Sequence, residues 1–229
     1  MIDGSSVWVV IPAFNEGKAI AQVLEDLAEY PYQIVVVDDG SQDDIAQCAL
    51  RYPVTLLKHV VNLGQGAALQ TGITYALSFS TTRYIVTFDA DGQHSASDIP
   101  PMLALLQSEQ YDVIIGSRFI KGGKAVNIGL TRRLTLWAAT LLTRLISGLH
   151  ITDTHNGLRV FTADAAVKIQ ITQNRMAHAS QILNQIAFLK MRYCEAPVSI
   201  TYTPYSRAKG QGILNGINIL WDIFLGNIR

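Results

Sequence analysis

Short runs of apolar residues alternate along this chain with longer segments in which apolar residues recur at helical spacing. Many residues of the short runs are β-branched, which favours strands, and the longer segments carry polar residues between the apolar ones, which favours helices. Strands are expected at 7–11, 34–37, 54–57, 85–88 and 113–115, and helices at 17–30, 43–51, 64–79 and 97–108. This alternation predicts an α/β fold with a mostly parallel central sheet and helices on both faces.

The pattern changes after residue 118. A loop rich in glycine and lysine at 121–124 precedes a long apolar helix expected at 130–149, and a final apolar helix is expected at 213–225. Two further strands at 158–161 and 198–202 could close the sheet. We interpret the loop as functional and not as a domain boundary, so all 229 residues are expected to form one domain.

Composition narrows the classes of partner. Lys plus Arg and Asp plus Glu are equal at 18 each, so no overall charge favours nucleic acid, and an anion site must depend on local residues. Only two cysteines are present and no spaced Cys/His set occurs, which favours a reduced, cytoplasmic protein over a disulfide-built one. We expect no signal peptide and no membrane span, so membrane attachment would be peripheral.

Polar residues gather just after the expected strands. In a parallel sheet, ligands bind outside the carboxyl ends of the strands. Segments 12–16, 38–41, 89–94 and 116–118 each follow an expected strand and should lie along one rim. The sequence therefore predicts a binding site at this rim.

The most informative of these segments follows the apolar run 84–88. Asp89 and Asp91 place two carboxylates one residue apart at a strand end, which is costly unless a cation or solvent compensates their charge. Mg²⁺ or Mn²⁺ prefers such oxygens and can bind a diphosphate at the same time, and Gln93 could add a third oxygen. His94 is expected to be a hydrogen-bonding neighbour. The alternative is a solvated acidic loop.

Two earlier strand ends carry residues suited to a nucleotide. Pro12 is expected to end the first strand, and Phe14 could stack on a base, with Glu16 as a polar neighbour. After the second strand, the carboxylates of Asp38 and Asp39 could accept hydrogen bonds from a base or from ribose hydroxyls. Both segments could instead be ordinary turns, with Phe14 in the core.

A glycine turn and a group of basic residues indicate contacts to phosphate. Gly64 and Gly66 precede and enter the third helix, so backbone amides could approach a phosphate, although a tight structural turn explains them equally well. Arg118 begins a segment with excess positive charge that also includes Lys121, Lys124, Arg132 and Arg133. Arginine can hold phosphate through two parallel hydrogen bonds, so a second anion is the expected partner. A solvated basic loop is the alternative.

Taken in order, these motifs resemble those of family 2 glycosyltransferases. The motifs are Pro12-x-Phe14-Asn15-Glu16, Val36-Val37-Asp38-Asp39-Gly40-Ser41, Asn62-x-Gly64, Asp89-x-Asp91-x-Gln93-His94, Gly116-Ser117-Arg118 and Asp153-x-x-x-Gly157. Within this family the chain resembles dolichol-phosphate mannose synthases and bacterial polyprenyl-phosphate sugar synthases, from about residue 7 to about residue 212. The resemblance implies a GT-A fold, a nucleotide-sugar donor and an inverting, metal-assisted transfer of a hexose.

The resemblance also implies a role for each matching residue. Nucleotide contacts are implied for Pro12, Phe14, Glu16, Asp38, Asp39, Gly64, Asp89 and Ala90, metal ligands for Asp89, Asp91 and Gln93, and acceptor or phosphate contacts for Arg118, Arg132, Arg207 and Lys209. Asp91 and Arg118 are the implied catalytic residues. Residues 1–118 would bind a UDP- or GDP-sugar, residues 119–229 would bind undecaprenyl or dolichyl phosphate, and the cofactor would be Mg²⁺ or Mn²⁺.

Two residues leave other interpretations open. Related sequences often carry an acid where this chain has Gln181, so a carboxylate role is in doubt there. A phosphate acceptor is ionised near pH 7 and needs little deprotonation, whereas a sugar hydroxyl needs a base, for which Asp153 is the candidate. A structural role for Asp153, four residues before Gly157, is the alternative. The alternatives are a transferase acting on a saccharide hydroxyl in cell-surface polysaccharide synthesis, or a non-catalytic nucleotide-sugar-binding module.

The two apolar helices expected at 130–149 and 213–225 are candidates for contact with a membrane. The first carries Arg132, Arg133 and Arg144 beside its apolar surface, which suits an anionic membrane face. Both helices could instead pack on the sheet, build a homo-oligomer or bind a separate membrane subunit. We expect a peripheral enzyme at the inner, cytoplasmic face of the cell membrane.

Overall fold

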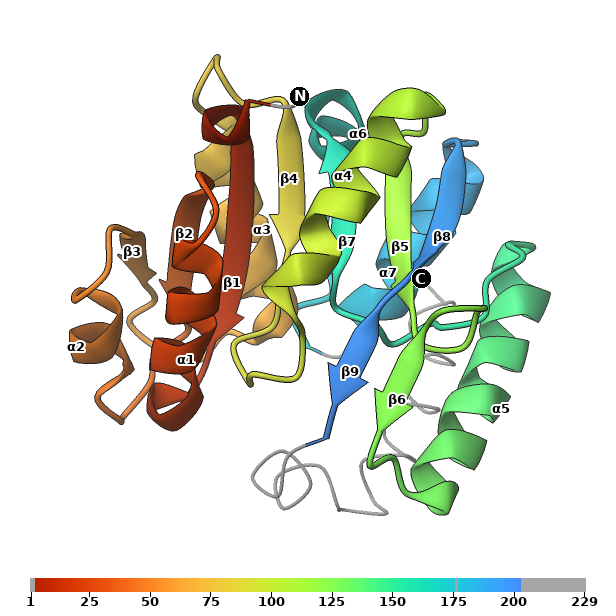
Figure 1. Ribbon diagram of the computed structural model, residues 1–229, viewed down its shortest axis with the longest axis horizontal. Helices are drawn as coiled ribbons and strands as arrows, with labels where there is room; N and C mark the ends of the chain where they lie inside the picture. The colour runs from red at the N-terminus through yellow and green to blue at the C-terminus, as the bar shows by residue number, and fades with distance from the viewer. Residues whose placement is uncertain (1–2, 176, 203–229) are drawn as a thin grey trace.

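A seven-stranded sheet forms the centre of the protein (Figure 1). The computed structural model describes residues 3–175 and 177–202. The strands are β1 Val7–Ala13, β2 Gln33–Asp38, β3 Thr55–Lys58, β4 Tyr84–Thr87, β5 Val113–Ser117, β7 Arg159–Thr162 and β8 Tyr193–Pro197, in the order β3-β2-β1-β4-β7-β5-β8. Strand β7 runs antiparallel to β4 and β5, and the other pairs are parallel, so the prediction of a mostly parallel sheet is confirmed.

Helices cover both faces of the sheet, as predicted. One face carries α1 Gly17–Ala28, α2 Ile45–Ala49 and α4 Ile99–Ser108, and the other carries α3 Gln65–Leu77, α6 Ala163–Lys168 and α7 His178–Phe188. Short 3₁₀ helices, η1 Gly4–Ser6 and η2 Ala96–Asp98, precede β1 and α4. Along β1, Val7, Val9 and Ile11 face the first group of helices and Trp8 and Val10 face the second, so this strand is buried on both sides.

The second half of the chain departs further from expectation than the first. The strands and helices expected before residue 118 are confirmed with ends within two residues, and the strand expected at 158–161 is β7. The sequence pattern does not predict β8, α6 and α7. The strand expected at 198–202 does not close the main sheet, because as β9 Ser199–Thr201 it pairs with β6 Lys124–Val126 in a second sheet. Strand β8 ends at Pro197, and the next N–H, that of Val198, still donates to the Ser117 carbonyl of β5 at 3.1 Å.

The prediction that Pro12 ends the first strand is wrong, because β1 continues to Ala13. The Val10 carbonyl accepts from the Phe88 N–H on the β4 side, and the Ala13 carbonyl accepts from the Asp39 N–H on the β2 side. Alternate residues of a strand direct their backbone groups to opposite neighbours, so Pro12 faces the β4 side. Pairing with β4 ends at Val10, and the missing N–H of Pro12 therefore leaves no partner unsatisfied.

Helix α5 Leu130–Ser147 confirms the long helix expected in the second half. Its buried residues are mostly small or polar, namely Leu136, Ala139, Thr140 and Thr143. Its large apolar residues are mostly exposed, namely Leu130, Leu134, Trp137, Leu141, Leu145 and Ile146. The helix expected at 213–225 lies outside the described residues, and none of the described helices is long and apolar enough to cross a membrane.

Candidate active site

Hydrogen bonds join the loops at the carboxyl ends of the strands into one rim. The Asn15 N–H donates to Ser41 Oγ at 3.0 Å and the Gln42 N–H donates to Asn15 Oδ1 at 2.9 Å, which connects the loops after β1 and β2. Gln65 Nε2 donates to Asp89 Oδ1 at 3.0 Å, which connects the start of α3 to the loop after β4. The segments that the sequence predicts at one rim are thus brought together.

Asp39 fixes the glycine turn before α3. Its buried carboxylate accepts hydrogen bonds from the N–H groups of Leu63 at 2.9 Å and Gly64 at 2.7 Å, and lies 2.7 Å from His59 Nδ1. Gly64 has a φ of +108°, and a Cβ there would lie 2.2 Å from the Asn174 carbonyl oxygen, so this turn requires glycine. Asp39 therefore shapes the turn, and its contact with a nucleotide stays a prediction.

The other predicted nucleotide contacts lie on the same rim. Asp38 is buried, accepts a hydrogen bond from the Ser41 N–H at 2.8 Å and has Lys58 Nζ at 3.7 Å. Glu16 is buried at the start of α1. Phe14 is 39% exposed and does not lie in the core, and its stacking on a base stays a prediction.

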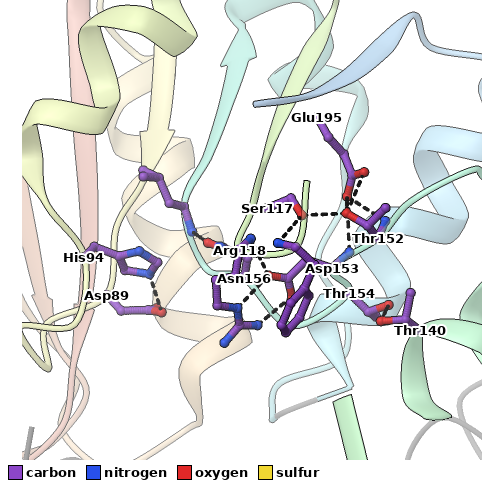
Figure 2. Close-up of polar contacts among 12 residues, drawn as sticks. Asp89, His94, Ser117, Arg118, Thr140, Thr152, Asp153, Thr154, Asn156 and Glu195 are labelled. Carbon is purple, nitrogen blue, oxygen red and sulfur yellow. Dashed lines mark hydrogen bonds and ion pairs between the residues drawn. The ribbon is translucent and has the colours of Figure 1, made fainter. Parts of the chain in front are cut away.

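Asp89 is held from two sides just after β4. Gln65 donates to Oδ1 at 3.0 Å, and His94 Nε2 lies 3.0 Å from Oδ2, so His94 is the hydrogen-bonding neighbour that the sequence predicts (Figure 2). Burial would raise the pKa of Asp89, but the hydrogen bond from His94 and the charge of the buried Arg159 hold that pKa below its ordinary value. Asp89 is therefore ionised at neutral pH.

Asp91 has the opposite balance. Burial and the nearby charge of Asp89 raise the pKa of Asp91 to about 6, although Gln93 donates to it from its backbone N–H at 3.0 Å and from its side-chain amide at 2.6 Å. Ala90 is buried between the two carboxylates. Positive charge near Asp91 is thus too small to compensate its ionised carboxylate. A divalent cation would supply that charge, so the donor set fits Mg²⁺ or Mn²⁺.

A metal ion here would need some ligands from outside the protein. Across residues 3–175 and 177–202, no group of three or more His, Cys, Asp or Glu side chains is arranged to hold a metal ion. Gln93 binds Asp91 through its amide nitrogen, so its role as a third ligand stays a prediction. With Asp89 and Asp91 as ligands, a diphosphate and water would complete the coordination that Mg²⁺ prefers.

Gly157 makes room for the Asp89 carboxylate. A Cβ at this position would lie 2.1 Å from Asp89 Oδ2, so any side chain would displace the carboxylate. The Gly157 carbonyl accepts from Thr87 Oγ1 at 2.6 Å, which fixes the segment before β7 against the end of β4. Because β7 is antiparallel to β4, its start lies at the same rim as the end of β4. Gly157 of the sequence motif is therefore a steric requirement of the candidate metal site.

Arg118 and Asp153 form a buried ion pair. Arg118 Nε and Nη2 donate to the two carboxylate oxygens of Asp153 at 2.6 and 2.5 Å, and Nη1 donates to the Tyr202 hydroxyl at 2.5 Å. Burial would lower the pKa of Arg118, but the hydrogen bonds and charge of Asp153 raise that pKa above its ordinary value. This geometry favours a structural role for both residues. It gives no support to the predicted contact of Arg118 with phosphate or to Asp153 as a base.

Glu195 on β8 fixes the loop that carries Asp153. Its carboxylate accepts from the N–H groups of Thr152 at 2.7 Å and Asp153 at 3.1 Å, and the Thr152 hydroxyl contacts Ser117 Oγ at 2.6 Å (Figure 2). No local pattern in the sequence points to Glu195 or Tyr202, because both act on residues far away in the chain.

The remaining predicted residues divide between the surface and the part of the chain that is not described. Arg132 is exposed in the first turn of α5, and its Cζ lies 5.0 Å from the centre of the Tyr202 ring. Arg207 and Lys209 lie outside the described residues. Their predicted contacts with the acceptor stay predictions.

Gln181 has a structural use at the position where related sequences often carry an acid. Its Oε1 accepts from the N–H groups of Thr172 and Gln173, each at 3.0 Å, and its Nε2 donates to Thr172 Oγ1 at 2.6 Å. The Asn174 carbonyl in the same loop accepts from the Gly66 N–H at 2.8 Å. A neutral amide cannot act as a base, so Gln181 serves this loop and not proton transfer.

The sheet order, the rim and the carboxylate pair after β4 define an α/β protein with a GT-A-like fold. Residues 8–169 match the family described as Glycosyl transferase family 2. The chain belongs to this family and is a glycosyltransferase, which confirms the resemblance inferred from its motifs.

Relatives of similar length include one of unassigned activity and two with named activities. An uncharacterized protein of Methanocaldococcus jannaschii is 35% identical over 99% of this chain and 94% of its own. A UDP-N-acetylglucosamine–dolichyl-phosphate N-acetylglucosaminyltransferase of Methanococcus voltae is 29% identical over 96% of this chain and 95% of its own. An undecaprenyl-phosphate mannosyltransferase of Micrococcus luteus is 28% identical over 92% and 89% of the two chains.

Solved structures support the fold. Glucosyl-3-phosphoglycerate synthase of Mycobacterium tuberculosis matches with a TM-score of 0.72 at 17% identity, over 96% of this chain and 80% of that one. The same enzyme in complex with Mn²⁺, uridine diphosphate and glucosyl-3-phosphoglycerate matches with a TM-score of 0.69 at 18% identity, over 96% and 79% of the two chains. At this level of identity the match concerns the fold alone.

The contact between Gly157 and Asp89 generates a first prediction. Gly157→Ala should weaken Mn²⁺ binding by about tenfold or more, because the new methyl group occupies the place of the Asp89 carboxylate. Binding is measured by electron paramagnetic resonance of free Mn²⁺. Gly129→Ala is the matched control, since no atom lies within 4 Å of a Cβ at that position. Unchanged affinity in a folded Gly157→Ala protein would contradict the steric role.

The raised pKa of Asp91 generates a second prediction. Its folded-state pKa of about 6 exceeds the unfolded value of about 3.9, so the group costs stability progressively as the pH rises from about 4 to about 6. Without metal, Asp91→Asn should therefore be more stable than the wild type near pH 7.5, by on the order of 1 kcal/mol after allowance for solvent screening. Gln93 can turn its amide to accept from the new side chain.

Urea unfolding checks this second prediction. The gap between the two proteins should shrink as the pH falls from about 7.5 to about 5. Excess Mn²⁺ should stabilise the wild type and leave Asp91→Asn almost unchanged, because binding to the native state stabilises it by mass action. A metal-free Asp91→Asn protein that is less stable than the wild type near pH 7.5 would refute the assignment.

Proposed function

We propose that this protein is an inverting, metal-dependent hexosyltransferase that moves a sugar from a UDP- or GDP-sugar to a polyprenyl phosphate at the cytoplasmic face of the membrane. The observation that carries the proposal is the Asp89 and Asp91 pair, which needs a cation and lies on the same rim as Asp39 and the exposed ring of Phe14. Two relatives that match this chain over nearly their whole length are named for transfer to dolichyl or undecaprenyl phosphate. Their names support a polyprenyl phosphate as the acceptor.

Different residues of the rim would contact different parts of the donor. Asp89 and Asp91 would hold Mg²⁺ or Mn²⁺, which supplies positive charge for the departing nucleoside diphosphate. Gln65 and His94 orient the Asp89 carboxylate, and Gln93 orients that of Asp91. On the other side of the rim, Phe14 would stack on the base and Asp39 keeps the adjoining turn in shape.

The chemistry of the acceptor follows from the two side chains considered as bases. Both carboxylate oxygens of Asp153 accept hydrogen bonds from Arg118. Gln181 is a neutral amide that accepts hydrogen bonds from the backbone of residues 172 and 173. A sugar hydroxyl would need a base to become a good nucleophile, whereas a phosphate monoester is ionised near neutral pH. The site therefore favours a phosphate acceptor over the saccharide hydroxyl of the alternative hypothesis.

The exposed side of α5 supports docking to a membrane. Leu130, Leu134, Trp137, Leu141 and Leu145 recur at spacings of three and four residues, so they form one outward stripe. At about 100° per residue, Arg133 and Arg144 lie along one edge of this stripe. An exposed apolar stripe with a tryptophan and flanking arginines suits the interface of an anionic bilayer.

The proposed reaction generates a third prediction. With Mn²⁺ and a panel of radiolabelled UDP- and GDP-sugars, the protein should transfer label from one preferred donor to a polyprenyl phosphate, giving a product that extracts into organic solvent with inverted anomeric configuration. Asp91→Ala should reduce the rate by about 100-fold or more, because the charge of the leaving diphosphate is no longer balanced. Label that enters only free saccharide, or donor binding without transfer, would refute the proposal.

The stripe on α5 generates a fourth prediction. Trp137→Ser should reduce co-sedimentation with anionic vesicles at low salt by roughly threefold, because a large interfacial side chain is lost. Phe188→Ser on α7 is the matched control, since Phe188 is 84% exposed and Trp137 66% exposed, but Phe188 lies outside the stripe. Equal losses for both variants would count against docking through α5.

A further inference from the structure

We infer that Tyr202 is a positioning residue that holds the Arg132 guanidinium in place for the phosphate of the acceptor. The inference rests on the proposed function, since it concerns the acceptor of that reaction. Tyr202 is 1% exposed and follows β9, and its N–H donates to the Val126 carbonyl at 3.1 Å. The residue is therefore anchored at the end of β6, shortly before α5 begins.

Tyr202 contacts two arginines with different parts of its side chain. Its hydroxyl accepts from Arg118 Nη1 at 2.5 Å, and Arg132 Cζ lies 5.0 Å from the centre of its ring. A planar guanidinium over an aromatic face is a favourable cation–π arrangement. The hydrogen bond fixes one end of the ring, and the ring in turn supports Arg132.

The two arginines differ in the charge that they leave for a ligand. Arg118 is balanced by the bidentate contact with Asp153. In the part of the chain that the structure describes, no carboxylate lies within 4.0 Å of Arg132. Arg118 and Arg132 are the arginines expected near phosphate that lie within the described residues. Of these two, Arg132 is the one whose charge is not already neutralised. Its planar fork can hold a phosphate through two hydrogen bonds.

The position of Arg132 on α5 fits this role. At about 100° per residue, it lies on the same side of the helix as Leu136, Ala139 and Thr143, which are buried. Arg132 is nevertheless exposed in the first turn, so its guanidinium lies over the Tyr202 ring and stays accessible to a phosphate from solvent. Stacking on a fixed ring already restricts the long Arg132 side chain. Binding a phosphate therefore costs less conformational entropy.

The same strand also ties Tyr202 to the candidate metal site. The Gln93 carbonyl accepts from the Thr201 N–H at 3.0 Å, and His94 forms a β-bridge with Ile200. Residues 200–202 therefore contact the loop that carries Asp91 and also provide the ring that supports Arg132. This arrangement fixes the acceptor arginine relative to the diphosphate end of the donor.

A double-mutant cycle on the full-length protein tests the inference. Binding of farnesyl phosphate, a short polyprenyl phosphate, is measured by isothermal titration calorimetry for the wild type, Tyr202→Leu, Arg132→Ala and the double variant. Arg132→Ala should weaken binding by about tenfold and Tyr202→Leu by about fivefold. The double variant should bind no more weakly than Arg132→Ala, because Tyr202 acts through Arg132. Additive losses would overturn the inference.

Tyr202→Phe keeps the cycle decisive if Tyr202→Leu fails to fold. Removal of the hydroxyl frees the ring from Arg118, so binding should weaken by about threefold when Arg132 is present and remain unchanged in the Arg132→Ala background. Equal losses in both backgrounds would overturn the inference and leave the proposed function intact. Absence of farnesyl phosphate binding by the wild type would reject the proposed acceptor and the inference together.

Discussion

The proximity of two carboxylates after β4 is the constraint on which the rest of the rim depends. Asp89 is compensated by Gln65, His94 and Arg159, and the backbone of Gly157 comes close enough to exclude any side chain beside it. Asp91 lacks comparable support, which is why its pKa is raised to about 6. The fold thus maintains a local excess of negative charge at neutral pH that an added cation would relieve. Sites of this kind cost stability, and the burial of the sheet on both faces offsets that cost.

The buried arginine beside this site makes a second constraint. Arg118 lies at the end of β5, where a free guanidinium could reach phosphate, but Asp153 takes up its charge. Removing either partner alone would leave an uncompensated buried charge. The pair therefore fixes the segment before β7, and with it Gly157 and Asp89. Because Asp153 is committed in this way, the proposed chemistry at the rim would need an acceptor that brings its own negative charge.

The sequence predicts those features whose cause is local. The β1 to β5 strands and the Asp89 and Asp91 pair follow from apolar runs and from what directly follows them. Strand β8 is short and carries the partly buried Cys194 and Glu195, so it lacks a clear strand pattern. Likewise, the partner of Arg118 lies 35 residues away, and it is the antiparallel insertion of β7 between β4 and β5 that brings the two together. Such pairings depend on topology, which no local pattern predicts.

In the proposed function, helix α5 would contact the membrane with one side and the acceptor with the opposite side. At about 100° per residue, Arg132 lies roughly opposite the stripe that contains Leu134, Trp137 and Leu141. A helix with its side chains is about 10 Å across, so a phosphate bound at Arg132 would stand about that far above a bilayer touching the stripe. Arg132 is in the first turn, and a lipid phosphate would therefore pass around the beginning of α5 and not across it. A long, flexible polyprenyl chain can span this distance while most of its length stays in the bilayer, which a short-chain lipid could not do.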